Sequence, residues 1–172
     1  TALGSLIVAK KLNCDMVKAC ESLQAWVPGV GRGFIKKMNL RKIGIITLID
    51  DGYNANPASI SAALDTLGKN EANRKIAILG DMKELGPSGV DYHKQIASLP
   101  VMSKVDCIHT IGPLMEYLHD SLPKEKRGFH FKNSIDVVPL LGTILKGGDC
   151  LLTKASLSVG MQVILEAIFS LE

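Results

Sequence analysis

The sequence predicts an α/β fold with a doubly wound, mostly parallel sheet and helices on both faces. From about residue 42 onward, short apolar runs alternate with segments of helical periodicity. These runs are apolar at nearly every position, which is typical of strands covered on both faces. The first run ends abruptly in Asp50 and Asp51, which indicates a strand that leads into a polar loop.

Two short helices are expected before this alternation begins. Residues 2–11 and 16–23 carry apolar side chains at helical spacing, and Asp15 can cap the second helix. The glycine-rich segment 28–33 cannot continue a helix. Helices of this size cannot bury both of their apolar faces alone. We therefore expect them to belong to a preceding domain that is mostly absent from this chain.

Five strand–helix units then follow in succession. Pro57 takes a favoured first-turn position in the first of their helices. Because each strand is followed by a helix, consecutive strands are expected to run parallel. The expected strands are 43–50, 75–80, 105–111, 129–132 and 149–154, and the expected helices are 57–67, 88–99, 113–119, 134–145 and 158–171.

Composition and charge argue against two classes of partner. The 172 residues carry a formal net charge of +3, and their densest basic run is Lys36, Lys37, Arg41 and Lys42. No aromatic residue interrupts that run, so we interpret it as a solvated linker rather than a nucleic-acid site. No apolar stretch approaches the ~20 residues of a membrane-spanning helix. Neither nucleic acid nor a membrane is expected as a partner.

The cysteines and the first residue bear on compartment and completeness. The four cysteines lack C-x-x-C spacing, so no metal site is predicted. Cys107 and Cys150 lie in apolar runs and are expected to be buried, reduced thiols of a cytoplasmic protein. The chain begins at Thr1, without a methionine or a signal-peptide pattern. We therefore expect a fragment of a longer protein, which we take to be a monomer.

The segment 48–57, LIDDGYNANP, is the strongest candidate for a binding site. In an open α/β sheet, ligands bind at the carboxyl ends of the strands. A carboxylate there can hold the hydroxyls of a ribose, and Tyr53 can cover the flat face of a base. The alternative is that the aspartates only make turn hydrogen bonds to the backbone. The residues alone leave both interpretations open.

The segment 79–86, LGDMKELG, is interpreted mainly as a structural loop. Its glycines allow tight backbone turns, Met82 and Leu85 pack, and Glu84 makes local hydrogen bonds. His93 follows on a predicted helix, where a single histidine is more often packed or capping than a catalytic base.

These segments resemble the C-terminal part of the Mur ligases, over nearly the whole chain. Residues 50–59 fit the family pattern D-D-x-Y-N-A-N-P-x-S, and residues 79–86 fit L-G-D-M-x-E-L-G. Residues 31–33 are similar to a G-R-G turn, and residues 148–161 to G-D-x-V-L-V-K-G-S-R-x-x-x-M. The resemblance implies a Rossmann-like C-terminal domain at residues 38–172. Residues 1–37 would be the C-terminal remnant of a central ATP-binding domain.

The resemblance also implies contacts with ATP. Asp51 would bind the ribose hydroxyls, and Tyr53 and Asn54 would lie where the loop meets the adenine and ribose. Arg32 would reach the phosphates, because guanidinium geometry suits phosphate oxygens.

Substrate contacts are expected from Asn56, Lys154 and Ser156. Each has an alternative: Asn56 can shape the loop and cap the next helix, and Lys154 can be an exposed strand-end lysine. Three positions depart from the family pattern. Ala155 replaces a glycine, Leu157 replaces an arginine, and Thr1 replaces an asparagine that helps to hold the adenine.

The implied activity is ATP-dependent amide ligation. The N-A-N-P run is typical of the branch that adds D-alanyl-D-alanine to UDP-N-acetylmuramoyl-tripeptide in peptidoglycan synthesis. The phosphate loop and the Mg²⁺ ligands of that branch lie in the central domain. No catalytic residue is therefore expected in this fragment, which should be inactive alone. The alternatives are a non-catalytic binding module, or remnant, of this fold and a related ligase with another substrate.

Overall fold

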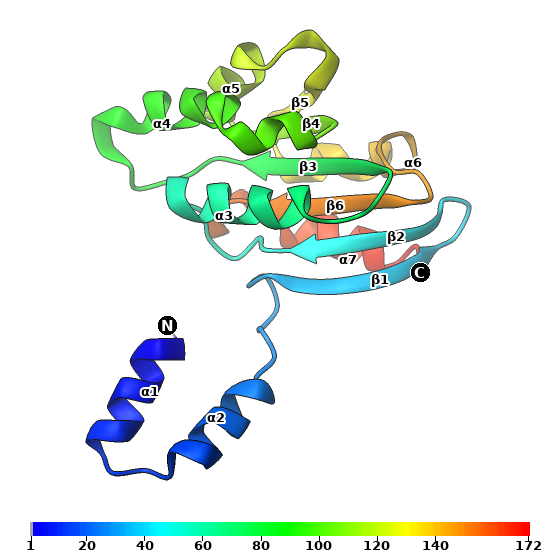
Figure 1. Ribbon diagram of the computed structural model, residues 1–172. Helices are drawn as coiled ribbons and strands as arrows, with labels where there is room; N and C mark the ends of the chain where they lie inside the picture. Colours follow the sequence, from blue (N-terminus) through cyan, green and yellow to red (C-terminus); the bar gives the residue numbers. More distant parts are fainter. Residues whose placement is uncertain (1) are drawn as a thin grey trace.

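The computed structural model describes residues 2–172, which form an α/β domain preceded by two helices (Figure 1). The domain is built on one sheet with the strand order β1-β2-β6-β3-β4-β5. β1 is antiparallel to β2, and the other neighbours are parallel. The strands are β1 (Phe34–Leu40), β2 (Gly44–Asp50), β3 (Arg74–Gly80), β4 (Cys107–Ile111), β5 (Arg127–Phe131) and β6 (Asp149–Lys154).

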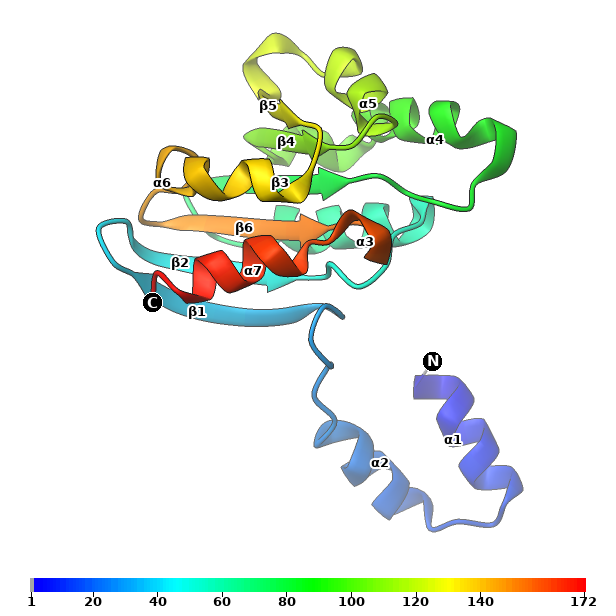
Figure 2. The same ribbon diagram turned by 180° about the vertical axis from the view of Figure 1, so that it is seen from behind.

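Helices cover both faces of the sheet, as the sequence predicts. One face packs against α3 (Pro57–Gly68), α4 (Gly89–Gln95) and α5 (Met115–Ser121). The other packs against α6 (Leu141–Ile144) and α7 (Gln162–Phe169), which lie in front of the sheet in Figure 2. Each face therefore has its own buried apolar core. The doubly wound, mostly parallel fold is confirmed.

The basic segment 36–42 is a correction to the sequence-based interpretation. It is not a solvated linker: most of it belongs to β1, which pairs with β2 along its whole length. Met38 and Leu40 are buried there, whereas Lys37 and Asn39 are exposed. Charged side chains on an edge strand discourage pairing with other chains. They also make the strand hard to recognise in the sequence.

Three predicted helices are shorter or less regular than expected. The predicted helix 134–145 is a 3₁₀ segment, Ser134–Leu140, followed by the single turn of α6. Pro139 lies inside it and cannot donate a backbone hydrogen bond. The predicted helix 158–171 begins only at Gln162, because Gly160 adopts a left-handed conformation with φ +77°. The predicted helix 88–99 ends as a helix at Gln95 and continues as a 3₁₀ turn.

The two N-terminal helices, α1 (Ala2–Lys11) and α2 (Met16–Gln24), have no buried residue. Asp15 caps α2 as predicted, since its carboxylate accepts from the amides of Val17 and Lys18 at 2.9 and 3.3 Å. Figures 1 and 2 show the pair projecting from the β1 end of the domain. Within residues 2–172, no helix has the length and apolar character needed to cross a membrane.

Candidate functional site

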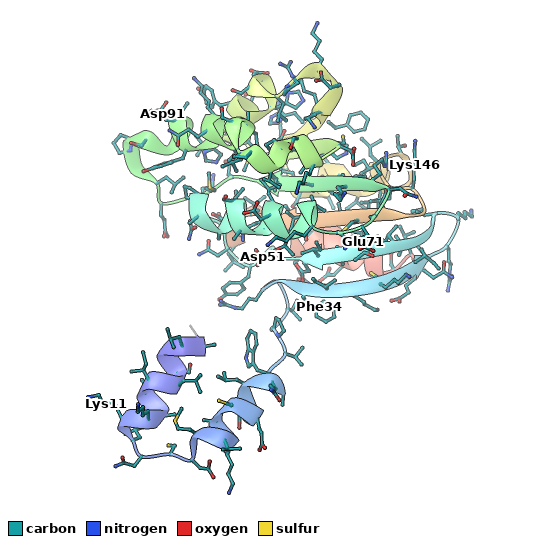
Figure 3. The ribbon with its side chains drawn as sticks, in the orientation of Figure 1. Lys11, Phe34, Asp51, Glu71, Asp91 and Lys146 are labelled. Atoms are coloured by element: carbon teal, nitrogen blue, oxygen red, sulfur yellow. The ribbon has the colours of Figure 1, made fainter. Side chains whose placement is uncertain are left out.

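The candidate site lies at the carboxyl edge of the sheet, where the loops after β2, β6 and β3 meet. The chain leaves β2 and β3 toward the face covered by α3 and α4, but leaves β6 toward the face covered by α7. β6 lies between the other two strands, so neighbouring loops diverge on both of its sides. Such a topological switch point is where open α/β sheets bind ligands. Figure 3 labels Asp51 at this edge and Lys146 at the opposite one.

Asp50, the last residue of β2, has a structural role. It is buried, and its Oδ2 accepts from the amide of Gly31 at 2.8 Å, while Oδ1 accepts from the amide of Gly52 at 3.2 Å. The second bond is an Asx turn, and the first ties the glycine-rich segment to the sheet. For Asp50, the structural alternative in the sequence analysis is therefore confirmed.

Asp51 pairs with Lys154, which lies at the end of the neighbouring strand β6. Lys154 is 1% exposed, and its Nζ lies 2.5 Å from Asp51 Oδ2. The same ammonium donates to the carbonyl of Asn54 at 3.0 Å. The alternative from the sequence analysis, an exposed strand-end lysine, is therefore wrong. Lys154 holds the loop after β2 in place and leaves the Asp51 side chain 25% exposed.

Arg32 and Tyr53 come together beside this loop. The guanidinium carbon of Arg32 lies 4.0 Å from the centre of the Tyr53 ring, which is a cation–π contact. The backbone amide of Tyr53 donates to the carbonyl of Gly31 at 3.0 Å. Gly31 has φ +75°, and a Cβ there would lie 3.0 Å from Tyr53 atoms. The turn thus needs glycine at this position, and it presents an exposed arginine and an exposed ring together.

Asn54 and Asn56 use their side chains within the loop. Asn54 Oδ1 accepts from the amide of Ala55 at 2.8 Å. Asn56 is the N-cap of α3 and forms a capping box with Ser59, with bonds of 2.8 and 3.0 Å. The capping alternative for Asn56 is confirmed, and a direct substrate contact by this residue stays a prediction.

The loop after β3 is fixed by a buried carboxylate that sequence reasoning left unassigned. Asp81 is 1% exposed, and its Oδ1 accepts from the amides of Leu114 and Met115 at 3.0 and 2.8 Å. Its Oδ2 pairs with Lys83 Nζ at 2.8 Å. Gly112 passes so close that a Cβ there would lie 2.6 Å from Asp81 Cγ. The signal in the sequence is the Gly112-Pro113 break after β4, which brings the start of α5 onto Asp81.

Two further bonds connect this loop to its surroundings. Ser156 Oγ accepts from the amide of Lys83 at 2.9 Å, and the amide of Ser156 donates to the carbonyl of Asp81 at 3.0 Å. Ser156 therefore joins the loops after β6 and β3. The buried His93 accepts from the amide of Met82 at 3.0 Å through Nε2 and lies 2.6 Å from the carbonyl of Gly89 through Nδ1. It is a packed histidine, as predicted.

Residues 38–157 match the family model described as "Mur ligase, glutamate ligase domain". The chain belongs to the Mur ligase family. A UDP-N-acetylmuramoyl-tripeptide–D-alanyl-D-alanine ligase of Rickettsia prowazekii is 27% identical over 165 residues, which are 95% of this chain and 35% of that protein. The protein of the same name from Buchnera aphidicola is 37% identical over 122 residues, or 70% of this chain and 26% of that protein.

Solved structures agree with the Mur ligase fold. A MurF structure from Acinetobacter baumannii superposes with a TM-score of 0.78 at 23% identity, over 98% of this chain and 36% of that chain. MurF of Thermotoga maritima in complex with ADP superposes with a TM-score of 0.75 at 24% identity, over 96% and 36%. At this identity the likeness is one of fold. This chain spans between about a quarter and about a third of the length of the relatives described here.

Within this Mur ligase chain, three hollows are lined by Asp51 or by Tyr53. Asp51 lines one of about 240 Å³ with Ser59 and Thr66 of α3. Tyr53 lines two others. One, of about 300 Å³, lies beside the start of α7. The other, of about 450 Å³, lies beside the loop after β3. The structure therefore places open space beside Asp51 and beside Tyr53, on whose ring Arg32 lies, although the contacts of these residues with ATP stay predictions.

The departures from the Mur ligase pattern have different structural consequences. Ala155 is fully buried and packs against Gly80. A Cβ added at Gly80 would lie only 2.7 Å from the Cβ of Ala155. Leu157 is 64% exposed and lines both hollows that Tyr53 lines. An apolar side chain thus stands where the family pattern has a cation. Thr1 lies outside the described residues.

The cysteines take no part in this site. Cys150 is buried and Cys107 is half-buried, close to the prediction. Burial raises the pKa of the Cys150 thiol to about 11, and burial likewise raises the pKa of Cys107. Both are therefore protonated at neutral pH and are poor nucleophiles.

Proposed function

We propose that this chain is the C-terminal part of an ATP-dependent ligase that joins D-alanyl-D-alanine to UDP-N-acetylmuramoyl-tripeptide in the cytoplasm, for peptidoglycan synthesis. Membership of the Mur ligase family and the names of its relatives support the reaction class. The observation that carries the proposal is that the Arg32–Tyr53 pair and the partly exposed Asp51 lie at the same edge of the sheet, at its switch point. A cation, a carboxylate and an aromatic face match the three chemical parts of a nucleotide.

Each of these residues has a defined role in the proposal. Asp51 would accept hydrogen bonds from the ribose hydroxyls through Oδ1, because Lys154 engages Oδ2. The exposed ring of Tyr53 would lie against the adenine. Arg32 would move from the Tyr53 ring to the phosphate oxygens, since both contacts suit a guanidinium. ATP would supply the phosphoryl group that activates a carboxylate for amide formation.

The proposal leaves Mg²⁺ to another part of the protein. Among residues 2–172, no group of three or more His, Cys, Asp or Glu side chains could hold a metal ion. Mg²⁺ prefers octahedral oxygen ligands, including carboxylates and phosphates. We propose that its protein ligands lie in a central domain that would end just before β1, since residues 34–37 already pair with β2 in the sheet. The unburied helices α1 and α2 would then complete that domain.

Nucleotide binding to the chain as given tests the Asp51 part of the proposal. Calorimetry with ATP, and separately with ADP and Mg²⁺, is expected to give weak, saturable binding. Asp51→Ala should weaken it about tenfold, the effect of losing a hydrogen bond to a charged group. The matched control is Asp65→Ala, which removes an exposed aspartate of α3. Equal affinities in the wild type and in Asp51→Ala would remove Asp51 from the site.

Ligase activity tests the reaction itself. The full-length protein should form an amide only with ATP and both substrates present, whereas the isolated chain should turn over none of them. The non-catalytic alternative is favoured by one observation, the exposed Leu157 in place of an arginine. A full-length protein that binds nucleotide but never forms the amide would favour that alternative.

A further inference from the structure

Asp50 holds two separate backbone segments at once through its buried side chain. Its Oδ2 accepts from the amide of Gly31 at 2.8 Å, and its Oδ1 accepts from the amide of Gly52 at 3.2 Å. Gly31 directly precedes Arg32, and Gly52 directly precedes Tyr53. One carboxylate therefore joins the two segments that carry the Arg32–Tyr53 pair.

Backbone hydrogen bonds strengthen the same crossing of residues 31–33 and 50–53. The amide of Gly33 donates to the carbonyl of Asp50 at 2.8 Å, and the amide of Tyr53 donates to the carbonyl of Gly31 at 3.0 Å. The backbone on both sides of Arg32 is thus tied to the end of β2. Only the side chain of Arg32 has to move when it leaves the Tyr53 ring for a ligand.

The chain just before this crossing is much more open to solvent. Trp26 is 64% exposed, Val27 is 68% exposed and Val30 is 71% exposed, whereas Gly31 is buried. The fixed part of the connection between α2 and β1 therefore begins at Gly31. Arg32 belongs structurally to the α/β domain, and its place beside Tyr53 does not depend on where α1 and α2 lie.

The crossing needs two acceptors on the side chain of residue 50. A carboxylate offers an acceptor on each of its oxygens, and both are used here. An asparagine has nearly the same size and shape but only one oxygen, and its NH₂ group would face the second N–H donor. Asp50→Asn therefore leaves one of the two amides without its acceptor and loosens one segment against the other.

We propose that Asp50 is a positioning residue for nucleotide binding, an inference that rests on the proposed roles of Arg32 and Tyr53 toward ATP. Asp50 is 1% exposed and acts through its two backbone partners. It sets the place of the cation relative to the ring before ATP arrives, so that less ordering is needed on binding. The two adjacent aspartates thus have different tasks: Asp51 faces the ligand, and Asp50 faces the protein.

Steady-state kinetics of the full-length ligase test the proposal. Asp50→Asn is expected to raise the KM for ATP by about tenfold and to change the KM for D-alanyl-D-alanine by less than about twofold. The matched control is Asp149→Asn, at an equally buried aspartate of the opposite edge, which accepts from Arg74 and from the amide of Lys146. This control should change the KM for ATP by less than about twofold.

Gly31→Ala disturbs the crossing from its other side and leaves the carboxylate in place. Gly31 has φ +75°, and a Cβ there would lie 3.0 Å from atoms of Tyr53. The substitution should therefore displace the turn and also raise the KM for ATP. This second variant keeps the proposal testable if Asp50→Asn does not fold. A KM for ATP that stays unchanged in a folded variant of either kind would overturn the proposal.

A double-mutant cycle shows whether Asp50 acts through the pair that it positions. In a protein that already carries Arg32→Ala and Tyr53→Ala, Asp50→Asn should change the KM for ATP by less than about twofold, because nothing remains to be positioned. A merely structural role would raise the KM by the same factor with and without the pair. That result would overturn the proposal.

The same variants separate failure of this role from failure of the proposed function. If Arg32→Ala with Tyr53→Ala raises the KM for ATP and Asp50→Asn does not, only the positioning role is wrong. If the paired substitution leaves that KM unchanged in an active ligase, the proposed contacts with ATP are wrong, and the positioning role falls with them. If the wild type forms no amide, the ligase function is wrong, and the cycle measured as ATP affinity by calorimetry decides the role of Asp50.

Discussion

The two N-terminal helices and the α/β domain both carry apolar side chains but bury them very differently. α1 and α2 contain no buried residue, and Leu3, Ile7 and Val17 are exposed. The strands of the domain, by contrast, are buried between two cores. Only a packed apolar side chain contributes fully to stability. The buried residues of the domain therefore carry the stability of the chain, and the helical pair contributes little to it.

The same substitution in the two regions should show the largest difference. Ile78→Ala removes a fully buried side chain from β3 and should lower the free energy of unfolding by about 2–5 kcal/mol, through lost burial and a cavity. Ile7→Ala alters an exposed residue of α1 and should change the free energy of unfolding by less than about 0.5 kcal/mol. Urea unfolding followed by circular dichroism measures both. Equal losses would mean that α1 is packed in solution.

The contrast also explains why the fold could be predicted from the sequence. Burial on both faces makes β2, β3 and β6 read as nearly continuous apolar runs, and their alternation with helices predicts a parallel sheet. β1 was missed because the basic residues in and after this edge strand were interpreted as a solvated linker. Its two buried residues, Met38 and Leu40, are too few to stand out beside four basic neighbours.

The site was predictable only in its local part. The segment 48–57 contains Asp51, Tyr53 and Asn54 in sequence, so its position after a strand indicated a binding loop. The long-range contacts could not be predicted. Lys154 is 103 residues from Asp51, and Ser156 is 73 residues from Lys83. Only the insertion of β6 between β2 and β3 brings these side chains together, and no local pattern records that strand order.

The next largest effect should come from His109, a buried histidine of the domain whose protonation makes the free energy of unfolding depend on pH. Burial, together with the positive charges of Arg74 and His119, lowers the pKa of His109 from 6.5 to about 4. Its Nδ1 accepts from the amide of Phe129 at 2.9 Å, which a protonated ring could not do. The unfolded chain therefore binds this proton first. The stability that neutral His109 contributes is present above pH 6.5 and is lost as the pH falls toward 4.

The loss should reach about 3 kcal/mol at most, from the size of the pKa shift. Comparing wild type with His109→Gln in urea at several pH values isolates it from the carboxylates, which both proteins share. The free energy of unfolding should fall more steeply in the wild type between pH 6.5 and 4. Parallel curves would show that His109 keeps its ordinary pKa. No histidine occurs in α1 or α2, so these helices should not contribute to the difference between the two pH profiles.

Comparing a buried ion pair with an exposed one tests whether Lys154 stabilises the loop after β2. Lys154→Met leaves Asp51 without its buried partner and should cost about 2 kcal/mol, less than a fully buried pair because Asp51 is 25% exposed. The matched control is Lys36→Met, which breaks the exposed pair with Glu172 at 2.6 Å and should cost less than about 1 kcal/mol. Thermal unfolding measures both. A larger loss for Lys36→Met would reverse the assignment of Lys154 as the residue that holds the loop.

The smallest effect expected on the domain comes from a helix cap, and it tests the contrast between the regions most directly. Asp15 and Asn56 each cap the helix that follows them, α2 and α3 respectively. Asn56→Ala should lower the stability of the domain by about 1 kcal/mol, because α3 packs on the sheet. Asp15→Ala should weaken amide protection in α2 by a similar amount but leave the unfolding midpoint of the domain unchanged. If Asp15→Ala also shifted that midpoint, the helices would have to unfold together with the sheet. Their exposed apolar side chains would then have to be covered by the domain itself rather than by a separate surface.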